Sequence, residues 1–304
     1  MIAAIIIIIG ALVYSSKNPN VAKKGDGGEI KIGIILGFTG PIKSLTPAMA
    51  ASAELAFKEA SESGSLLGGA NISVIRADST CNDLATATAA AESVISKGVV
   101  AIIGADCSDV TGAIASNVTI PNGVVMISPS ATSPELTTLD DKGFFFRTAT
   151  SDARGGQILA DITKDRKVKS VAITYTNNEY EKGLADVYKA SVQAHGIEVT
   201  TMSAHEDGKA DYSSEVATLA SAGGDAIVII GYLNQGGKEI IKGALDSGSF
   251  DKFILSDGMI GNSLTDAFGN DLNKSFGFLP GSMNKKTAGA FTTVAKAAGI
   301  DSSG

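Results

Sequence analysis

Residues 30–60 read IKIGIILGFTGPIKSLTPAMAASAELAFKEA and carry the pattern that decides the fold. An apolar run of strand length, 30–36, leads into a turn, and Thr46 is then expected to cap a helix with Pro47 at its first position. One face of this helix carries the apolar residues Met49, Ala53, Ala56, Phe57 and Ala60. A strand that is apolar along nearly its whole length is typical of a parallel sheet covered by helices on both faces.

The alternation of strand and helix continues along the chain. Further strands are expected at 71–77, 99–105, 124–128, 170–175, 197–202, 225–231 and 253–256. Helices are expected at 83–97, 109–118, from Ser151 onward, and at 181–195, 211–222 and 235–247. Right-handed βαβ units follow, in two blocks that change near residues 148–151. The sequence therefore predicts an α/β fold of two doubly wound parallel-sheet lobes, with a ligand cleft between them at the carboxyl ends of the strands.

The N-terminal segment 1–28 differs from the rest of the chain. Residues 2–14 are uncharged and apolar, and a polar, Gly-rich tether follows them. This length matches the apolar part of a signal peptide and falls short of the roughly 20 residues that span a bilayer. An uncleaved anchor, a mis-assigned start codon or a buried strand are the alternatives. We expect an exported protein, in the periplasm or at the cell surface.

Composition and motifs exclude several function classes. The formal net charge of −7 and the lack of basic blocks argue against nucleic-acid binding. His195 and His205 have no partners that suggest a metal site or a catalytic relay. The turn GFTGP (37–41) lacks the third glycine of a dinucleotide fingerprint, and GYLNQGGKE (231–239) departs from a phosphate loop. We expect no cofactor, no metal and no enzymatic activity.

Two cysteines follow two of the expected strands. Cys81 comes after the second strand and Cys107 after the third. If these strands are adjacent, their ends lie within disulfide reach, and an even cysteine count in an exported protein favours a bridge. A pair of buried free thiols is the alternative.

Two loops at strand ends are rich in small hydroxyl residues. One includes Ser108 and Thr111, and the other, residues 128–136, includes Ser130 and Thr132. Hydroxyls and exposed amides in such loops can bind a carboxylate. Ordinary capping and turn formation explain the same composition.

The stretch GADCSDVTGAIASNVTIPNGVVMISPSATSPELT (104–137) resembles the branched-chain amino-acid (leucine/isoleucine/valine) binding proteins of ABC importers, which are type I periplasmic binding proteins. The turn FTGP and the later stretches NNEYEKGLAD and SDGMIGNS are similar to that family as well. The resemblance covers the chain from about Glu29 onward. It implies a Cys81–Cys107 disulfide and two lobes that close around an amino acid and deliver it to a membrane permease.

The resemblance also implies a set of ligand-binding residues. The α-carboxylate and ammonium of the ligand are expected at Ser108, Ser130 and Thr132 of the first lobe. Tyr180 and Tyr232 are expected to cover the ligand from the second lobe. Asp257 stands where the family places an acidic residue against the ammonium, although a turn residue before Gly258 is the simpler interpretation of this position alone.

Two departures from the family pattern affect these expectations. Leu45 stands near the place of a first-lobe aromatic residue, and the chain ends where the family continues. The implied domains are 29–150 plus 281–304 as an incomplete first lobe and 151–280 as the second lobe. The expected function is that of a monomeric extracytoplasmic binding protein for a small amino acid, leucine included. A sensory module of the same fold, or an importer component for amides or aromatic acids, is the alternative.

Overall fold

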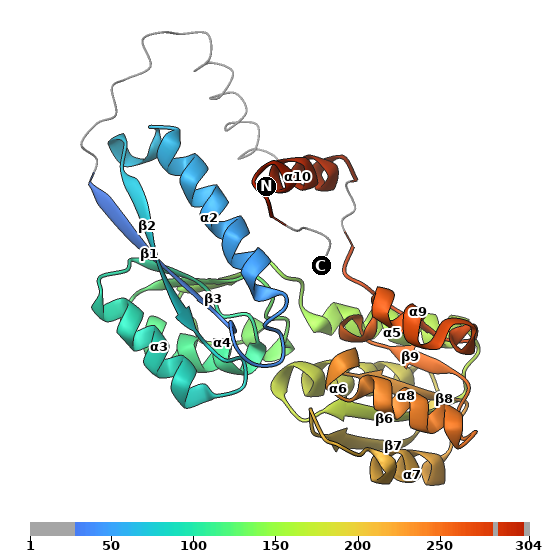
Figure 1. Ribbon diagram of the computed structural model, residues 1–304. Helices are drawn as coiled ribbons and strands as arrows, with labels where there is room; N and C mark the ends of the chain where they lie inside the picture. Colours follow the sequence, from blue (N-terminus) through green and yellow to red (C-terminus); the bar gives the residue numbers. More distant parts are fainter. Residues whose placement is uncertain (1–27, 282–284, 301–304) are drawn as a thin grey trace.

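The computed structural model describes residues 28–281 and 285–300, and within them it contains two parallel sheets of five strands (Figure 1). The first sheet has the order β2-β1-β3-β4-β5, and the second has the matching order β7-β6-β8-β9-β10. The strands are β1 (Glu29–Leu36), β2 (Asn71–Asp78), β3 (Ala101–Gly104), β4 (Val125–Ser128), β5 (Phe145–Arg147), β6 (Ser170–Thr176), β7 (Glu198–His205), β8 (Ala226–Ile230), β9 (Phe253–Leu255) and β10 (Phe276–Gly277). The apolar N-terminal segment and its predicted export role lie outside the described residues.

Helices cover these sheets. Those of the first half are α2 (Thr46–Glu62), α3 (Leu84–Ser96) and α4 (Ser108–Ile114), and α4 continues into a π-helical turn, Ala115–Thr119. Those of the second half are α5 (Asp152–Asp165), α6 (Glu179–Ala194), α7 (Ser213–Ala222), α8 (Gly237–Asp246) and α9 (Asn262–Phe268). A further helix, α10 (Lys285–Ala297), follows the second sheet and covers neither sheet; most of its described side chains are exposed. We call the β1–β5 sheet with its helices the first lobe, and the β6–β10 sheet with its helices the second lobe.

Burial on both faces explains why the central strands are apolar throughout. In β8, Ile227 and Ile229 belong to a core that includes Leu219 of α7 and Ile240 of α8. Val228 and Ile230, which point the other way, belong to a second core that includes Leu159 of α5 and Leu184 of α6. Successive side chains of a strand alternate between the faces of the sheet, so a strand covered on both sides has no polar face.

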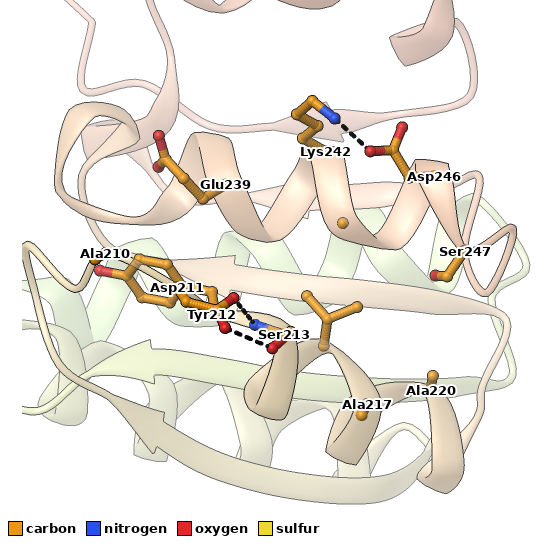
Figure 2. A pocket seen from close by; sticks show the side chains of 12 residues that line it. Ala210, Asp211, Tyr212, Ser213, Ala217, Ala220, Glu239, Lys242, Asp246 and Ser247 are labelled. Atoms are coloured by element: carbon orange, nitrogen blue, oxygen red, sulfur yellow. Dashed lines mark hydrogen bonds and ion pairs between the residues drawn. The ribbon is translucent and has the colours of Figure 1, made fainter.

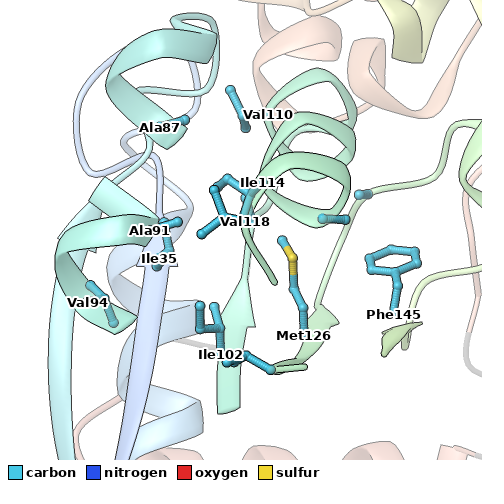
Figure 3. Close-up of a cluster of buried hydrophobic side chains, with 14 of the residues drawn as sticks. Ile35, Ala87, Ala91, Val94, Ile102, Val110, Ile114, Val118, Met126 and Phe145 are labelled. Atoms are coloured by element: carbon cyan, nitrogen blue, oxygen red, sulfur yellow. The ribbon is translucent and has the colours of Figure 1, made fainter. Parts of the chain in front are cut away.

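The first lobe is built in the same way. Ile35, Ile102 and Met126 of its sheet pack against apolar residues of α3 and α4, as Figure 3 shows. Ile34 and Leu36 alternate with Ile35 and pack on the opposite face, around Ala50 of α2. The predicted doubly wound fold is confirmed in both lobes.

Several predicted element boundaries need correction. Thr46 is the first residue of α2 and does not cap it; its buried hydroxyl donates instead to the carbonyl of Gly37, at 3.0 Å. Ala56 of the predicted apolar face is exposed. The expected strand 99–105 shortens to β3, whose last residue is Gly104. The sequence analysis also missed β5, β10, α9 and α10; the first three hold only two to seven residues and so give little periodicity.

The chain passes from the first sheet to the second at residues 148–151, between the end of β5 and the start of α5. The change of sheet thus falls where the sequence predicts a change of block. The assignment of residues 281–304 to the first lobe stays a prediction, and we propose the domain boundaries as the sequence gives them.

The disulfide between Cys81 and Cys107 is present, with a Cα–Cα distance of 5.3 Å. β2 and β3 are not adjacent, as the predicted disulfide reach assumed, because β1 lies between them. The loop after β2 instead turns across the end of β1, with Thr80 and Cys81 at positive φ. A Cβ on Gly37, which follows β1, would lie only 3.3 Å from the Cβ of Cys81, so a glycine there lets the loop pass.

Candidate ligand-binding site

A cavity of about 680 Å³ lies between the lobes. Its walls come from loops at the carboxyl ends of strands, such as Asp106–Ser108 after β3 and Tyr232 after β8. In each sheet the strand order reverses at this place, between β1 and β3 and between β6 and β8. Ligands of doubly wound folds bind at such topological switch points, which makes this cavity the candidate site.

The cavity brings together the six residues that the sequence analysis singled out as ligand-binding. Ser108, Ser130, Thr132, Tyr180, Tyr232 and Asp257 line it, together with both cysteines of the disulfide. The first three come from the first lobe and the other three from the second. This placement agrees with the predicted site, and the role of each residue toward a ligand stays a prediction.

Tyr180, Tyr232 and Asp257 form a connected group in the second lobe. The Tyr180 hydroxyl donates a hydrogen bond of 2.7 Å to Oδ1 of Asp257. The rings of Tyr180 and Tyr232 lie 6.0 Å apart and tilted by 49°. Burial and the neighbouring Asp257 carboxylate raise the pKa of Tyr180 well above its usual value, so the phenol keeps its proton as a donor. Asp257 opens a short 3-10 turn and also lines the cavity, so its two interpretations are compatible.

The three first-lobe hydroxyls differ in what they can offer a ligand. The Ser130 hydroxyl donates to the carbonyl of Asp106 at 2.9 Å. The buried Ser108 hydroxyl accepts from the N–H of Ser133 at 3.2 Å, which leaves its proton available for a ligand oxygen. The Thr132 hydroxyl lies against Asp152 and lowers the pKa of that carboxyl. Ser108 is therefore the best-placed donor of the three.

Asp106 fixes the loops that carry these hydroxyls. Its carboxylate is 3% exposed and accepts hydrogen bonds from the Gly37 N–H at 2.7 Å, the Cys107 N–H at 3.0 Å and the Ser79 hydroxyl at 3.2 Å. It thereby joins the loops after β1, β2 and β3. Burial raises the pKa of Asp106, and these hydrogen bonds to the charged form partly oppose the shift.

The sequence analysis missed other residues of the cavity. Four further carboxylates line it, and they belong to Asp106, Asp109, Glu181 and Asp207. Apolar walls come from Ile42, Leu45, Met49, Leu84, Leu233, Met259, Ile260 and Leu279. Leu45 reaches the cavity from the first lobe and is 40% exposed. Glu181 follows Tyr180 directly, but an acidic residue in the first turn of a helix is so common that it gave no signal.

Asp152 lies beside this site at the start of α5, and the pKa of its carboxyl group is raised. Its carboxyl is 4% exposed, and Oδ2 has no hydrogen-bond partner among the described residues. Burial, together with repulsion from Asp257, raises its pKa to about 7, although Thr132 and Arg147 oppose the shift. At neutral pH this group is close to half protonated.

We expect Asp152 to make stability depend on pH. Its pKa of about 7 in the folded chain lies above the ordinary value of 3.8, so its stabilising contribution is complete below about pH 4 and is lost as the pH rises toward 7. Between pH 5 and 7 the loss is about 2–3 kcal/mol, at about 1.4 kcal/mol per pH unit. Denaturant unfolding at pH 5, 6 and 7 should show a flatter profile for Asp152→Asn than for the natural chain.

The control variant is Asp165→Asn, which removes an exposed carboxylate at the far end of the same helix. Its profile should run parallel to that of the natural chain. Parallel profiles for all three proteins would show that Asp152 is ionised throughout this range and would contradict the prediction.

A second hollow, of about 550 Å³, lies between α7 and α8 (Figure 2). Three of the four charged groups that line it have partners among the described residues: Lys242 pairs with Asp246, and Asp211 accepts hydrogen bonds from Ser213. The fourth is Glu239. Most of the remaining wall is alanine, glycine, serine and valine. This groove offers a ligand little specific chemistry, so the cavity between the lobes remains the candidate site.

Other sites were tested within the described part of the chain. Residues 28–281 and 285–300 contain no group of three or more His, Cys, Asp or Glu side chains that could hold a metal ion. The same residues include no helix that is long and apolar enough to cross a membrane.

His205 is buried, and its ring nitrogens contact Thr174 and Thr176; burial lowers its pKa to about 4.

Comparison with known proteins agrees with this geometry. The family model described as "Periplasmic binding protein" matches residues 29–300. A "Leu/Ile/Val-binding protein homolog 3" of Brucella melitensis is 30% identical over 210 residues, which cover 69% of this chain and 56% of the relative. A "Leucine-, isoleucine-, valine-, threonine-, and alanine-binding protein" of Pseudomonas aeruginosa is 29% identical over 246 residues, 81% of this chain and 64% of the relative.

A solved structure is similar as well. The branched-chain amino acid transporter substrate binding protein LivJ from Streptococcus pneumoniae, in complex with isoleucine, superimposes with a TM-score of 0.74 at 25% identity. The match covers 88% of this chain and 77% of that structure. This chain spans less than two thirds of the length of the two curated relatives, at 56% and 64%. The family model and these relatives together show that the chain belongs to the periplasmic binding protein family and is similar there to branched-chain amino-acid binding proteins.

Proposed function

We propose that this chain is the extracytoplasmic substrate-binding component of an ABC importer and that it binds a small α-amino acid of the branched-chain type in the cavity between its lobes. The single observation that carries the proposal is the lining of the cavity. Hydroxyl residues of the first lobe, the carboxylate of Asp257 and the rings of Tyr180 and Tyr232 from the second lobe, and apolar side chains line the same space. The hydroxyls would hold the α-carboxylate, Asp257 the ammonium, and the apolar walls the side chain. The names of the relatives support the choice of ligand.

The partner in this proposal is a membrane permease, and the location is the periplasm or the cell surface. The proposed role requires no catalysis, and the site residues bind rather than react. A sensory module of the same fold would use the same cavity, and permease and ATPase genes beside this one would favour import.

The test of the proposal is a thermal-shift panel of amino acids, amides and aromatic acids on this chain. A ligand at 100 times its Kd should add about 2.7 kcal/mol of stability. Leucine, isoleucine and valine should stabilise the chain most. Stabilisation by an amide or an aromatic acid, and by none of the amino acids, would replace the proposed ligand class.

Lobe closure is the proposed mechanism, and contacts between the lobes support it. The Asp109 carboxylate of α4 accepts a hydrogen bond from the Glu179 N–H, at the start of α6 in the other lobe, at 3.2 Å. On another side the Gln235 amide donates to the carbonyl of Pro41 at 3.5 Å. Hinge bending at 148–151 and 278–283 would break and form such contacts. Residues 282–284 of the second segment lie outside the described residues.

Gly183 of α6 offers a test that leaves the cavity untouched. A Cβ at this position would lie 2.9 Å from Cδ of Pro134 in the first lobe, so a larger residue can be accommodated only if the lobes separate. We expect Gly183→Val to weaken binding of every ligand about 5- to 100-fold, from a clash of about 1–3 kcal/mol in the closed state. Small-angle scattering should show ligand-induced compaction in the natural chain and less of it in the variant.

Gly196 provides the matched control, because a Cβ there meets nothing within 4 Å and the residue lies outside the contact between the lobes. Since Gly196 has a positive φ, Gly196→Asn is the least strained replacement. It should leave affinity and compaction unchanged. Identical scattering profiles with and without saturating ligand in the natural chain would show that binding needs no closure.

A further inference from the structure

Among the described residues, Glu181 is the one carboxylate lining the cavity that has no hydrogen-bond partner. Among the five carboxylates that line the cavity, Asp106, Asp109, Asp207 and Asp257 each accept at least one hydrogen bond from the described residues. Both oxygens of Glu181 are buried and accept none. The whole residue is 0% exposed, although it lines the cavity. Folding has therefore placed a desolvated carboxyl group at the cavity with its hydrogen-bonding capacity unused.

The surroundings of Glu181 make the ionised group costly in the empty protein. Burial raises its pKa well above the usual range, and repulsion from Asp207 and Asp109 adds to the shift. Its own N–H and the Asn178 side chain, neither of which is in hydrogen-bond geometry with the carboxyl oxygens, oppose the shift only in part. A buried, unpaired charge costs several kcal/mol, so such groups are paired or neutralised in native proteins. A cation placed against this carboxylate would remove both the repulsion and the unpaired charge.

The cavity supplies no cation of its own. No lysine, arginine or histidine is among the described residues that line it. Tyr232 adds an aromatic ring to the lining of the same cavity, and a ring of this kind attracts a ligand cation. The second lobe thus offers a ligand cation two carboxyl groups that differ in their state: Asp257, which Tyr180 holds by a hydrogen bond, and Glu181, which has no such partner among the described residues.

We propose that Glu181 binds a second positive charge of the ligand, so that the cavity takes α-amino acids whose side chain ends in an ammonium or guanidinium group as well as branched-chain ones. The inference rests on the proposed function, because the first charge of the ligand is the α-ammonium at Asp257. The aliphatic stem of such a side chain would lie along the apolar walls, as lysine and arginine stems do elsewhere. A branched-chain ligand would leave Glu181 unpaired and protonated.

The test compares leucine with ornithine, lysine and arginine by calorimetry on three proteins. The natural chain should bind at least one of the three cationic amino acids. Glu181→Gln, which keeps the shape and removes the charge, should weaken that ligand at least tenfold and leave leucine unchanged or tighter. Asp186→Asn is the matched control: it removes a carboxylate from the same helix that is exposed and does not line the cavity. This variant should keep the ratio of the leucine Kd to the Kd of the cationic amino acid within about twofold of the ratio in the natural chain.

Each outcome decides the inference. Binding of leucine without binding of any cationic amino acid would overturn it and leave the proposed function standing. An equal affinity ratio in Glu181→Gln and in the natural chain would overturn it as well. If the natural chain, folded by circular dichroism, binds neither ligand class, the proposed function fails first.

A second measurement does not depend on the folding of the variant. In the natural chain, a cationic ligand should drive Glu181 to ionise, because its protonated form offers no charge. Calorimetry in two buffers of different ionisation enthalpy should then show release of up to one proton per cationic ligand near pH 6. The carboxyl groups of Asp106, Asp109, Asp152 and Asp207 titrate nearby, so the same measurement with leucine supplies the baseline. Equal proton release for both ligands would contradict the role of Glu181.

Discussion

Replacing Asp257 with alanine should weaken the binding of an α-amino acid about 30-fold or more. Asp257 lines the cavity, and its Oδ1 is already fixed by the Tyr180 hydroxyl at 2.7 Å. A ligand ammonium held there would lose its charge partner in a closed site, which costs about 2–5 kcal/mol. At 1.4 kcal/mol per tenfold, the lower bound corresponds to roughly 30-fold in Kd.

The matching deaminated acid is the control ligand for this prediction. It carries the same carboxylate and side chain without the ammonium, so Asp257→Ala should weaken it little or even improve it. Calorimetry of both ligands on both proteins gives four affinities. Equal losses for the two ligands would mean that Asp257 supports the fold of its turn rather than the ligand charge.

Tyr180→Phe separates the two parts of this acidic group. The variant keeps the ring beside Tyr232 and removes the hydroxyl that holds Asp257 in place. Its effect on the amino acid should be smaller than that of Asp257→Ala, since the carboxylate remains. A loss as large as that of Asp257→Ala would assign the main ligand contact to the phenol instead.

Removing the disulfide should lower the free energy of unfolding by about 3–4 kcal/mol. The bridge closes a loop between cysteines 26 residues apart, and in the chain-entropy model its stabilisation comes from restricting the unfolded chain. The change to test is the double replacement Cys81→Ala with Cys107→Ala, measured by denaturant unfolding. Mass spectrometry of the natural chain without reductant should find both thiols protected from alkylation.

The bridge should also matter for binding, because Cys107 directly precedes Ser108 and both cysteines line the cavity. We expect the double variant to bind its ligand more weakly, because the loop that carries Ser108 loses its covalent link to Cys81. Ser63→Ala with Ser65→Ala, in the exposed turn after α2, is a control with the same number of small replacements. Free thiols in the natural chain, or unchanged stability of the double cysteine variant, would contradict the prediction.

The placement of the site could be predicted because it depends on strand ends. Apolar strands fix where each sheet ends, and Ser108, Tyr232 and Asp257 all follow such strands within a few residues. The ends of parallel strands share one edge of a sheet, so a cavity is expected there, and the family resemblance then names the residues that line it. The path of the disulfide could not be predicted in the same way, because strand order across β1 is a property of the assembled sheet.

The sequence by itself determined the two parallel sheets and the strand ends where a site was to be sought. These features depend on local patterns: hydrophobic period, strand length and turn composition. The six ligand-binding residues and the cysteine pairing were implied by the resemblance to the binding-protein family. Tertiary structure alone decided the state of individual side chains. The two carboxyl groups of Asp152 and Glu181 are acidic residues in the first turn of a helix, a pattern that sequence cannot separate from ordinary capping. Packing between elements distant in the chain excluded water from both groups. It left Oδ2 of Asp152 and both carboxyl oxygens of Glu181 without a hydrogen-bond partner among the described residues. Desolvation, which depends on everything around a group, raised the pKa of both carboxyl groups.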